Sequence, residues 1–298
     1  MEKRNKKMKV VCLPYAGGSA LMYGRWKNLF DDRIEIVQLE LPGRGLRFKD
    51  ESPSTMEELT EDMKIRLMKL VGDENYILLG FCYGAIVSYS IYEQLVREKS
   101  EHMPKGMILI SSLPPGEHSK AERLFEMTNL KIVKALLGIF SFNPFAASDD
   151  EMDVLKTMLE IVNPDVAKEL RSMNLLQLIL AFLFPKYRKA ANCQTVLRIM
   201  RADGRVMYGY NGEKDSIPVR VPVIAIHGKK DNVVTSEHMY GWKQFCDGEF
   251  QLKEVNGGHL MLFDEDTDFV PVLRESIAGL QEEWKERKIG QMLFGEKQ

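Results

Sequence analysis

The sequence contains few cysteines, and their spacing suggests neither a metal site nor a disulfide scaffold. Its 298 residues include four widely separated cysteines: Cys12, Cys82, Cys193 and Cys246. There is no Cys-x-x-Cys pair and no group of cysteines and histidines at zinc spacing. The sequence therefore predicts no bound metal, and its cysteine usage favours a reducing, cytoplasmic location.

Long apolar runs and an excess of one charge are missing as well. The most apolar stretch, 175–184, is far shorter than the roughly 18 to 20 residues that span a bilayer. The basic N-terminus imitates the start of a signal peptide, but its apolar run stops at Pro14, so we expect no secretion signal. The 41 Lys and Arg residues balance 43 Asp and Glu residues, which leaves nucleic-acid binding without electrostatic support.

The chain also lacks the glycine patterns that bind nucleotides. The loop at 14–19 has no Gly-x-Gly-x-x-Gly, the segment 43–45 lacks the third glycine, and no P-loop lysine motif occurs. We therefore expect no nucleotide cofactor. Apolar material is plentiful: 45% of the residues are hydrophobic, enough for a complete globular core.

Short apolar runs alternate with segments of helical periodicity. The strand-like runs occupy 8–13, 34–39, 76–79, 106–111, 221–226 and 250–255. Two helices are expected at 56–71 and 84–97; in the first, the apolar residues at helical spacing are Met56, Leu59, Met63, Leu67 and Leu70. This alternation predicts an α/β fold, with a mostly parallel central sheet flanked by helices on both faces.

Between about Pro114 and Arg198 the strand candidates disappear and helical periodicity continues. We interpret 115–198 as a helical lid on a single domain, 1–298, whose core comprises about 1–114 and 199–298. Large apolar residues of this segment could line a channel, although packing of the lid on the core is the simpler interpretation: Phe140, Phe142, Phe145, Leu180, Phe182 and Phe184. A helix end and a loose tail are expected at 286–298.

The most informative motif is Gly80-Phe81-Cys82-Tyr83-Gly84, which lies between a predicted strand and a predicted helix. At such an elbow the nucleophile occupies a sharp turn, and the flanking glycines let strand and helix approach. Cys82 is the predicted nucleophile, and the positive end of the helix favours its thiolate. The alternative is a small buried cysteine in a glycine-rich turn.

A general base and an orienting acid are expected after later strands. His259 follows a Gly-Gly turn past the last strand, and His227, at the end of the preceding strand, is the weaker candidate. Asp231 lies between nucleophile and histidine in chain order, where its carboxylate could hold the imidazole in the productive tautomer. Asp203 and Asp247 are weaker candidates for the acid.

An oxyanion hole completes such a site. The backbone N–H of Tyr83, the residue after the nucleophile, supplies one donor by geometry. The second donor is expected from the loop after the first strand, at Ala16 or its neighbour.

Five segments together resemble the stand-alone type II thioesterases of the α/β-hydrolase superfamily, which accompany nonribosomal peptide and polyketide synthetases. Beside the elbow, these are PYAGGSA (14–20), LPGRGLR (41–47), LRIMRADGRVMYGY (197–210) and GGHLMLF (257–263). The resemblance implies a Cys82-His259-Asp231 triad with oxyanion amides from Ala16 and Tyr83. It further implies acyl or aminoacyl thioesters on the phosphopantetheine arm of acyl or peptidyl carrier proteins, with no cofactor of the enzyme's own.

Cys82 departs from this family, which usually has serine at that position. A cysteine forms a second thioester in place of an oxoester, so transfer of the acyl group to an amine, hydroxyl or thiol is an alternative to hydrolysis. A third interpretation is a catalytically silent scaffold that binds carrier proteins. Arg44 or Arg47 is expected to meet an acidic helix of the carrier. No pattern specifies an oligomeric state.

Overall fold

The computed structural model describes residues 7–117, 126, 132, 191–210, 212, 216–264 and 266–294. Within these residues six strands form one sheet in the order β2-β1-β3-β4-β5-β6, and all neighbouring strands are parallel. The strands are β1 (Met8–Leu13), β2 (Ile34–Gln38), β3 (Asn75–Phe81), β4 (Met107–Ile110), β5 (Val223–Gly228) and β6 (Phe250–Val255). The predicted α/β fold with a parallel sheet is confirmed.

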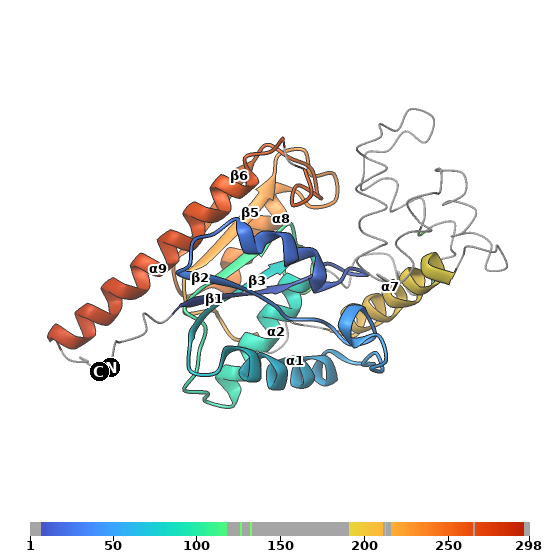
Figure 1. Cartoon of the computed structure of the whole chain (residues 1–298), viewed down its shortest axis with the longest axis horizontal. Coiled ribbons are helices and arrows are strands. Elements are labelled where there is room, and N and C mark those ends of the chain that lie inside the picture. Colours follow the sequence, from blue (N-terminus) through green and yellow to red (C-terminus); the bar gives the residue numbers. More distant parts are fainter. Residues whose placement is uncertain are drawn as a thin grey trace.

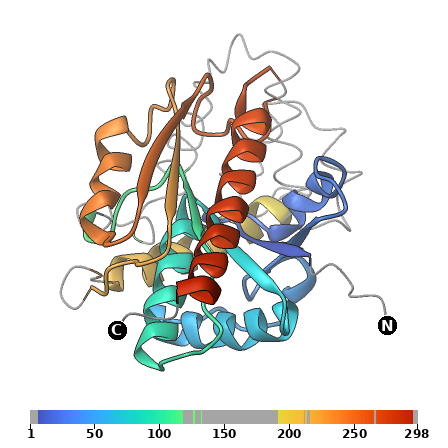
Figure 2. The ribbon, with the colours of Figure 1, turned by 90° about the vertical axis from the view of Figure 1, so that its left-hand side faces the viewer.

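Helices cover both faces of this sheet (Figures 1 and 2). On one face, α1 (Met56–Val71) and α2 (Tyr83–Arg97) bury their apolar sides together with Leu78 of β3. On the other, α9 (Phe269–Phe294) and the 3-10 helix η1 (Ala20–Asn28) pack against Ile77 and Leu79 of the same strand. Neighbouring residues of β3 thus point to the apolar cores on opposite faces of the sheet. A strand that is buried on both faces therefore has a continuous apolar sequence.

The remaining elements that the structure describes lie around the sheet. They are η2 (Gly45–Arg47), α7 (Ala191–Gly209), α8 (Ser236–Gly241) and η6 (Trp242–Phe245). Most of the expected lid, 115–198, falls outside the described residues, including the six apolar residues considered for an acyl channel. The division into core and lid therefore stays a prediction, although α7 runs without a break through the expected boundary at 198.

The helix at 56–71 matches its predicted bounds. Its N-cap is Thr55, whose side chain accepts the Glu58 N–H over 3.2 Å. In return, the Glu58 carboxylate accepts the Ser54 N–H over 2.9 Å. Of the five apolar residues at helical spacing, Leu70 stays outside the core: it is 37% exposed, and the adjacent Val71 is buried. Near a helix end the last apolar position depends on the angle at which the neighbouring element crosses.

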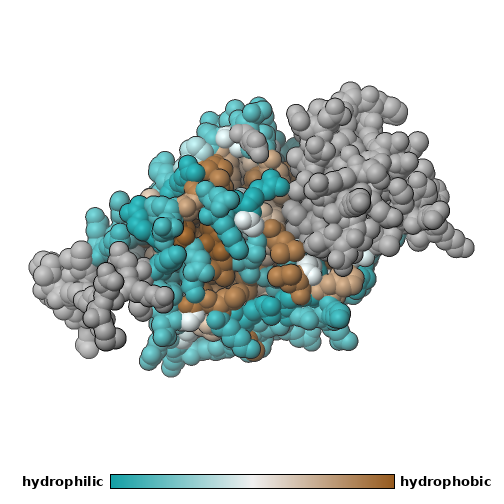
Figure 3. Space-filling view, viewed as in Figure 1, coloured by the Kyte–Doolittle hydropathy of each residue, from teal (hydrophilic) through white to brown (hydrophobic). Residues whose placement is uncertain are grey.

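The face shown in Figure 3 has hydrophilic borders, and apolar side chains gather toward its middle. Among the described residues, no helix is both long and apolar enough to cross a membrane. α9 is the longest helix described and ends at Phe294, within the segment where a helix end was expected. Because all strands run the same way, the loops after β1, β3, β5 and β6 meet at one edge, which we call the carboxyl edge.

Candidate active site

Cys82 occupies the turn between β3 and α2. Its φ of +52° lies in the left-handed region that residues with a side chain rarely adopt. The backbone is fixed on both sides: the Cys82 N–H donates to the Ile110 carbonyl over 2.8 Å, and the Cys82 carbonyl accepts the Ala85 N–H over 3.0 Å. The strained turn places the half-buried thiol at the carboxyl edge, as a nucleophile elbow requires.

The glycines on either side of Cys82 are needed because backbone passes close to both. A Cβ on Gly80 would lie 2.3 Å from the Gly84 carbonyl oxygen, and a Cβ on Gly84 would lie 2.3 Å from the Leu13 carbonyl oxygen. Both distances are far shorter than van der Waals contact, and neither neighbour is a flexible side chain. Strand and helix therefore approach as closely as the motif predicts.

His259 and Asp231 meet at the same edge, in the loops after β6 and β5. Asp231 Oδ2 lies 2.9 Å from His259 Nδ1. The other carboxylate oxygen, Oδ1, accepts the backbone N–H groups of Val233 over 2.8 Å and Val234 over 2.9 Å. The carboxylate is thus held by its own loop, and it keeps the proton of the imidazole on Nδ1, which leaves Nε2 for proton transfer.

Burial and charge shift the titration of both groups. The side chain of His259 is 4% exposed and that of Asp231 is inaccessible. Burial alone would lower the pKa of His259, but hydrogen bonds to Asp231 and Cys82 and the charges of both raise it to about 10. For Asp231 burial acts against ionisation, yet the hydrogen bond and charge of His259 and two backbone N–H groups hold its pKa below the usual value. The structure therefore brings the three predicted triad residues into one electrostatic unit.

Aromatic rings border this unit. The His259 ring lies 5.5 Å from that of Phe81, centroid to centroid. Tyr15 contacts Phe81 edge-on at 5.5 Å and Phe263 at 6.2 Å. Phe81 therefore packs beside the imidazole and Tyr15 packs against Phe81, and the low exposure of His259 strengthens its hydrogen bonds.

The weaker candidates have other partners. The Nε2 of His227 donates to the Val234 carbonyl over 2.9 Å, and its Nδ1 lies 3.8 Å from the Glu254 carboxylate, so this histidine packs at the end of β5. Asp247 is exposed at the surface and lies 4.0 Å from Arg220. Among the described residues, the side-chain hydrogen bonds and ion pairs of His227 and Asp247 involve no triad residue.

Asp203, the third candidate for the acid, forms a buried ion pair. Arg44 Nη1 donates to Asp203 Oδ2 over 2.7 Å, and Nη2 donates to Oδ1; the two side chains are 2% and 5% exposed. Arg44 therefore cannot meet a carrier protein, and that prediction is wrong. Arg47 is also buried, and it pairs with Asp50 and Asp62. The fold brings acidic partners to both arginines, and the sequence around each arginine does not reveal that its side chain is buried.

Two backbone N–H groups, one in the loop 14–19 and one directly after it, are already bonded to buried carboxylates of other segments. The Gly17 N–H donates to Asp203 Oδ2 over 2.8 Å, and the Ala20 N–H donates to Glu40 Oε1 over 3.0 Å. An N–H bound to a carboxylate is not available to an oxyanion. Of the neighbours left open by the sequence, Gly17 is thereby excluded, and Ala16 stays the predicted donor.

Tyr83, the other predicted donor, is the first residue of α2. An N–H at this position has no acceptor within its own helix, so it is available to a substrate oxygen. The Tyr83 side chain is buried, and its hydroxyl makes no hydrogen bond within the described part of the chain.

Sequence reasoning missed two buried polar groups of the carboxyl edge, the Arg44–Asp203 pair and Glu40. Glu40 accepts the Ser19 hydroxyl as well as the Ala20 N–H, and burial raises its pKa. One signal was available: the segments 41–47 and 197–210 resemble the family, yet the triad uses none of their residues.

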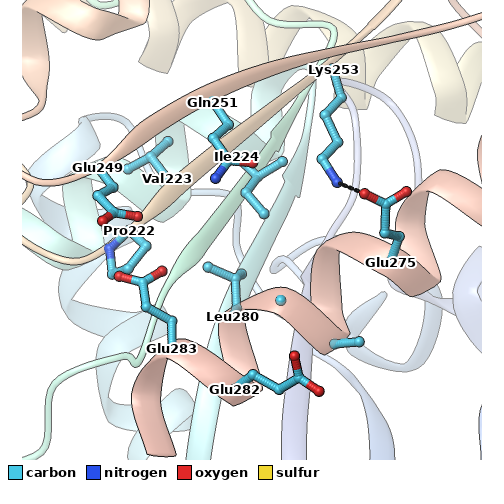
Figure 4. Close-up of a pocket in the computed structure, with 12 residues that line it drawn as sticks. Pro222, Val223, Ile224, Glu249, Gln251, Lys253, Glu275, Leu280, Glu282 and Glu283 are labelled. Carbon is cyan, nitrogen blue, oxygen red and sulfur yellow. Dashed lines mark hydrogen bonds and ion pairs between the residues drawn. The ribbon is translucent and has the colours of Figure 1, made fainter. Parts of the chain in front are cut away.

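Figure 4 shows a cavity of about 300 Å³ between α9 and the first residues of β5 and β6. These residues lie at the opposite edge of the sheet, which we call the amino edge. Glu249, Glu282 and Glu283 border the cavity, and Lys253 pairs with Glu275 over 2.8 Å. The cavity contains no triad residue and is therefore separate from the candidate active site.

Comparison with known proteins is consistent with this geometry. The model of the thioesterase domain family matches residues 8–277. Gramicidin S biosynthesis protein GrsT of Aneurinibacillus migulanus is 24% identical over 264 residues, which cover 89% of this chain and 86% of that protein.

Solved structures with the same fold include ClbQ from the colibactin NRPS/PKS pathway, with a TM-score of 0.68 and 18% identity over 92% of this chain and 98% of that chain. YbtT, a type II thioesterase from the yersiniabactin NRPS/PKS pathway, has a TM-score of 0.63 and 20% identity over 96% and 95% of the two chains.

Proposed function

Since the chain belongs to the thioesterase family, we propose that it hydrolyses acyl or aminoacyl thioesters on the phosphopantetheine arm of carrier proteins, through a Cys82-His259-Asp231 triad. The observation that carries this proposal is the thiol on a strained strand-to-helix turn beside a hydrogen-bonded, buried His259–Asp231 pair. A nucleophile, a base and an orienting acid are the parts that acyl transfer needs.

In the first half-reaction, Cys82 Sγ attacks the thioester carbonyl while His259 Nε2, whose pKa is raised to about 10, holds the proton that the thiol has given up. The N–H groups of Tyr83 and Ala16 donate to the oxygen on which negative charge develops. As the tetrahedral intermediate collapses, the bond between the carbonyl carbon and the pantetheine sulfur breaks, and that sulfur takes the proton from His259. The products are a free pantetheine thiol and an acyl thioester on Cys82.

In the second half-reaction, water attacks the acyl-Cys82 carbonyl while His259 accepts its proton. Collapse of this intermediate releases the carboxylic acid and returns the proton to the Cys82 sulfur. Asp231 stabilises the imidazolium in both halves because its carboxylate bonds to Nδ1. The transferase alternative differs only in the attacking group, and the names of the similar proteins do not support it.

The names of the similar proteins support the biosynthetic setting. GrsT belongs to gramicidin S biosynthesis, and ClbQ and YbtT belong to NRPS/PKS pathways. We extend this setting to the present chain, with carrier proteins as partners and no cofactor beyond the phosphopantetheine that a carrier brings. A reducing, cytoplasmic environment would keep Cys82 as a thiol.

The proposal is tested by recording intact-protein mass and thiol release after mixing the chain with a panel of acyl-pantetheine thioesters. We expect an adduct on Cys82 that decays in water with turnover, and no adduct on Cys82→Ala. Full turnover by Cys82→Ala would refute the nucleophile. An adduct that persists in water until an amine or alcohol removes it would identify a transferase.

A further inference from the structure

The buried ion pair of Arg44 and Asp203 binds the loop after β1 at two consecutive residues. Asp203 Oδ2 accepts the Gly17 N–H over 2.8 Å, and Arg44 Nη1 donates to the Gly18 carbonyl over 3.2 Å. These two side-chain atoms also bond to each other over 2.7 Å. Loop and ion pair therefore close a ring of hydrogen bonds, and these two peptide groups of the loop cannot rotate without breaking it.

Helix α7 supports the same point of the loop in a second way. Gly17 has a φ of +81°, and a Cβ there would lie 2.5 Å from Met200 Cγ. Met200 and Asp203 both belong to α7, so one helix fills the space beside Gly17 and binds its N–H. The loop lies directly against the helix, and the carboxylate holds it in register.

The same ion pair lies beside the residue that carries the other predicted oxyanion donor. Burial raises the pKa of the Tyr83 phenol, the negative charge of Asp203 raises it further, and the positive charge of Arg44 lowers it. The Tyr83 phenol thus interacts electrostatically with both members of the ion pair. Arg44 and Asp203 therefore bond to the loop that carries one proposed oxyanion donor and interact electrostatically with the residue that carries the other.

We propose that Arg44 and Asp203 are positioning residues, which hold the loop 14–19 so that the Ala16 N–H points at the developing oxyanion. The Gly17 N–H belongs to the peptide group directly after Ala16, so fixing it limits how the Ala16 donor can turn. Displacing a reacting group by about 1 Å can cost a factor of about 100 in rate. This inference rests on the proposed function, because it assigns a role within the same reaction.

The first test compares two reactions of Cys82 in Asp203→Asn. Cleavage of an acyl-pantetheine thioester needs the oxyanion hole, whereas alkylation by iodoacetamide displaces iodide at carbon and forms no oxyanion. We expect kcat to fall about 10- to 100-fold with KM little changed, while the alkylation rate stays within about twofold of that of the unmodified chain. Unchanged turnover, or an equal loss in both reactions, would overturn the proposal.

Glu93→Gln is the matched control. Glu93 is also a buried acid, and it accepts the Ile217 N–H over 3.0 Å and the Tyr210 hydroxyl over 2.7 Å. Neither partner belongs to the loop 14–19. Thioester turnover by Glu93→Gln should therefore exceed that of Asp203→Asn at least fivefold when both are folded, and equal losses would contradict a specific role.

A double variant separates positioning from stability. Replacing both members of a buried ion pair by apolar residues avoids an unpaired buried charge, so Arg44→Met with Asp203→Leu is expected to have a thermal midpoint at least as high as that of Asp203→Leu alone. Turnover should stay low in this variant because the Gly17 N–H and the Gly18 carbonyl lose their partners. Recovery of both midpoint and turnover would show a merely structural role. If the double variant does not fold, the two rates of Asp203→Asn decide alone.

Failure of the proposed function would be visible separately. In that case the unmodified chain would cleave no thioester although Cys82 is still alkylated. Amide hydrogen exchange in the peptide containing 14–20 then tests the positioning: faster exchange in Asp203→Asn than in Glu93→Gln supports it, and equal exchange refutes it.

Discussion

At the carboxyl edge of the sheet, neighbouring backbone atoms leave no room for a side chain at Gly84. At the amino edge, Gly279 of α9 borders the cavity of Figure 4, and an added Cβ there would have no neighbouring atom within 4 Å outside its own helix backbone. The charged side chains of the two edges differ likewise in their exposure to solvent. Asp231 is inaccessible and bonds to His259, whereas Glu275 at the amino edge is 74% exposed although it pairs with Lys253.

The carboxyl edge is the one at which backbone and charged groups are held in place, as the proposed reaction requires. Close backbone contacts leave no room for added atoms, and removing one partner of a buried charge pair is costly because the other charge stays buried and unpaired. An exposed ion pair and an open glycine can be altered with little effect. The following substitutions test this contrast, from the largest expected effect to the smallest.

Asp231→Asn is expected to lower kcat/KM for an acyl-pantetheine thioester about 1,000-fold. An amide in place of Oδ2 does not hold the imidazole in its productive tautomer and does not stabilise the imidazolium. Steady-state thiol release measures the loss, and circular dichroism controls for folding. A loss smaller than that of Asp203→Asn would show that the acid has been assigned to the wrong aspartate.

Gly84→Ala is expected to lower the free energy of unfolding by about 3 kcal/mol or more, because the new Cβ meets the Leu13 carbonyl oxygen, a backbone atom that cannot move aside. Urea unfolding monitored by tryptophan fluorescence measures the change. A loss below about 1 kcal/mol would mean that the elbow is less tightly packed than its geometry indicates.

The pH dependence of stability should reveal the raised pKa of His259. Its folded value of about 10 lies above the unfolded value, so protonated His259 contributes stability fully below pH ~6.5, and the contribution disappears as the pH rises toward 10. The difference in unfolding free energy between the unmodified chain and His259→Gln should therefore shrink over this range. A difference that stays constant or grows would show that the imidazole is neutral in the folded protein.

His238→Gln is the control for that measurement, because His238 is half-buried in α8 and its Nδ1 accepts the Thr235 N–H, whereas Asp231 bonds to His259. Reducing agent is needed throughout, since Cys82 must stay a thiol. Urea unfolding at a series of pH values gives both differences.

Gly279→Ala is expected to raise the free energy of unfolding by about 0.5 to 1 kcal/mol. The position lies within α9 and its surroundings are open, so alanine gains helix propensity without a clash. The same urea assay applies. A destabilisation instead would mean that the amino edge is more tightly built than its cavity suggests.

Much of the carboxyl edge could be predicted because its signals are local. The runs 8–13 and 250–255 match β1 and β6 residue for residue. β1 is buried on both faces and is an almost continuous apolar run, whereas the edge strand β6 is partly exposed and alternates apolar with polar residues over Phe250–Lys253. The elbow around Cys82 is likewise a short motif in which each residue type answers a need of the turn. Asp231 and His259 follow from the order in which late strands end.

The errors concern residues whose partners are distant in the chain. Arg44 was placed at the surface, but its partner Asp203 is 159 residues away and comes from α7. Glu40 was not considered, because its partners Ser19 and Ala20 are distant in the chain and only the fold brings them to its carboxylate. Leu70 and Val71 are adjacent, and only the packing of α1 decided which of them is buried.

The sequence by itself determined the strands and the glycine-flanked position of Cys82, because each depends on steric needs of a few neighbouring residues, and it predicted Cys82, Asp231 and His259 as the triad. The tertiary structure alone decided which charges are buried and which N–H groups remain available, because a hydrogen bond or an ion pair depends on distances across the whole fold. The 2.9 Å contact of Asp231 with His259 and the ring that joins Asp203, Arg44, Gly17 and Gly18 exist only when four separate loops and α7 converge on one edge of the sheet.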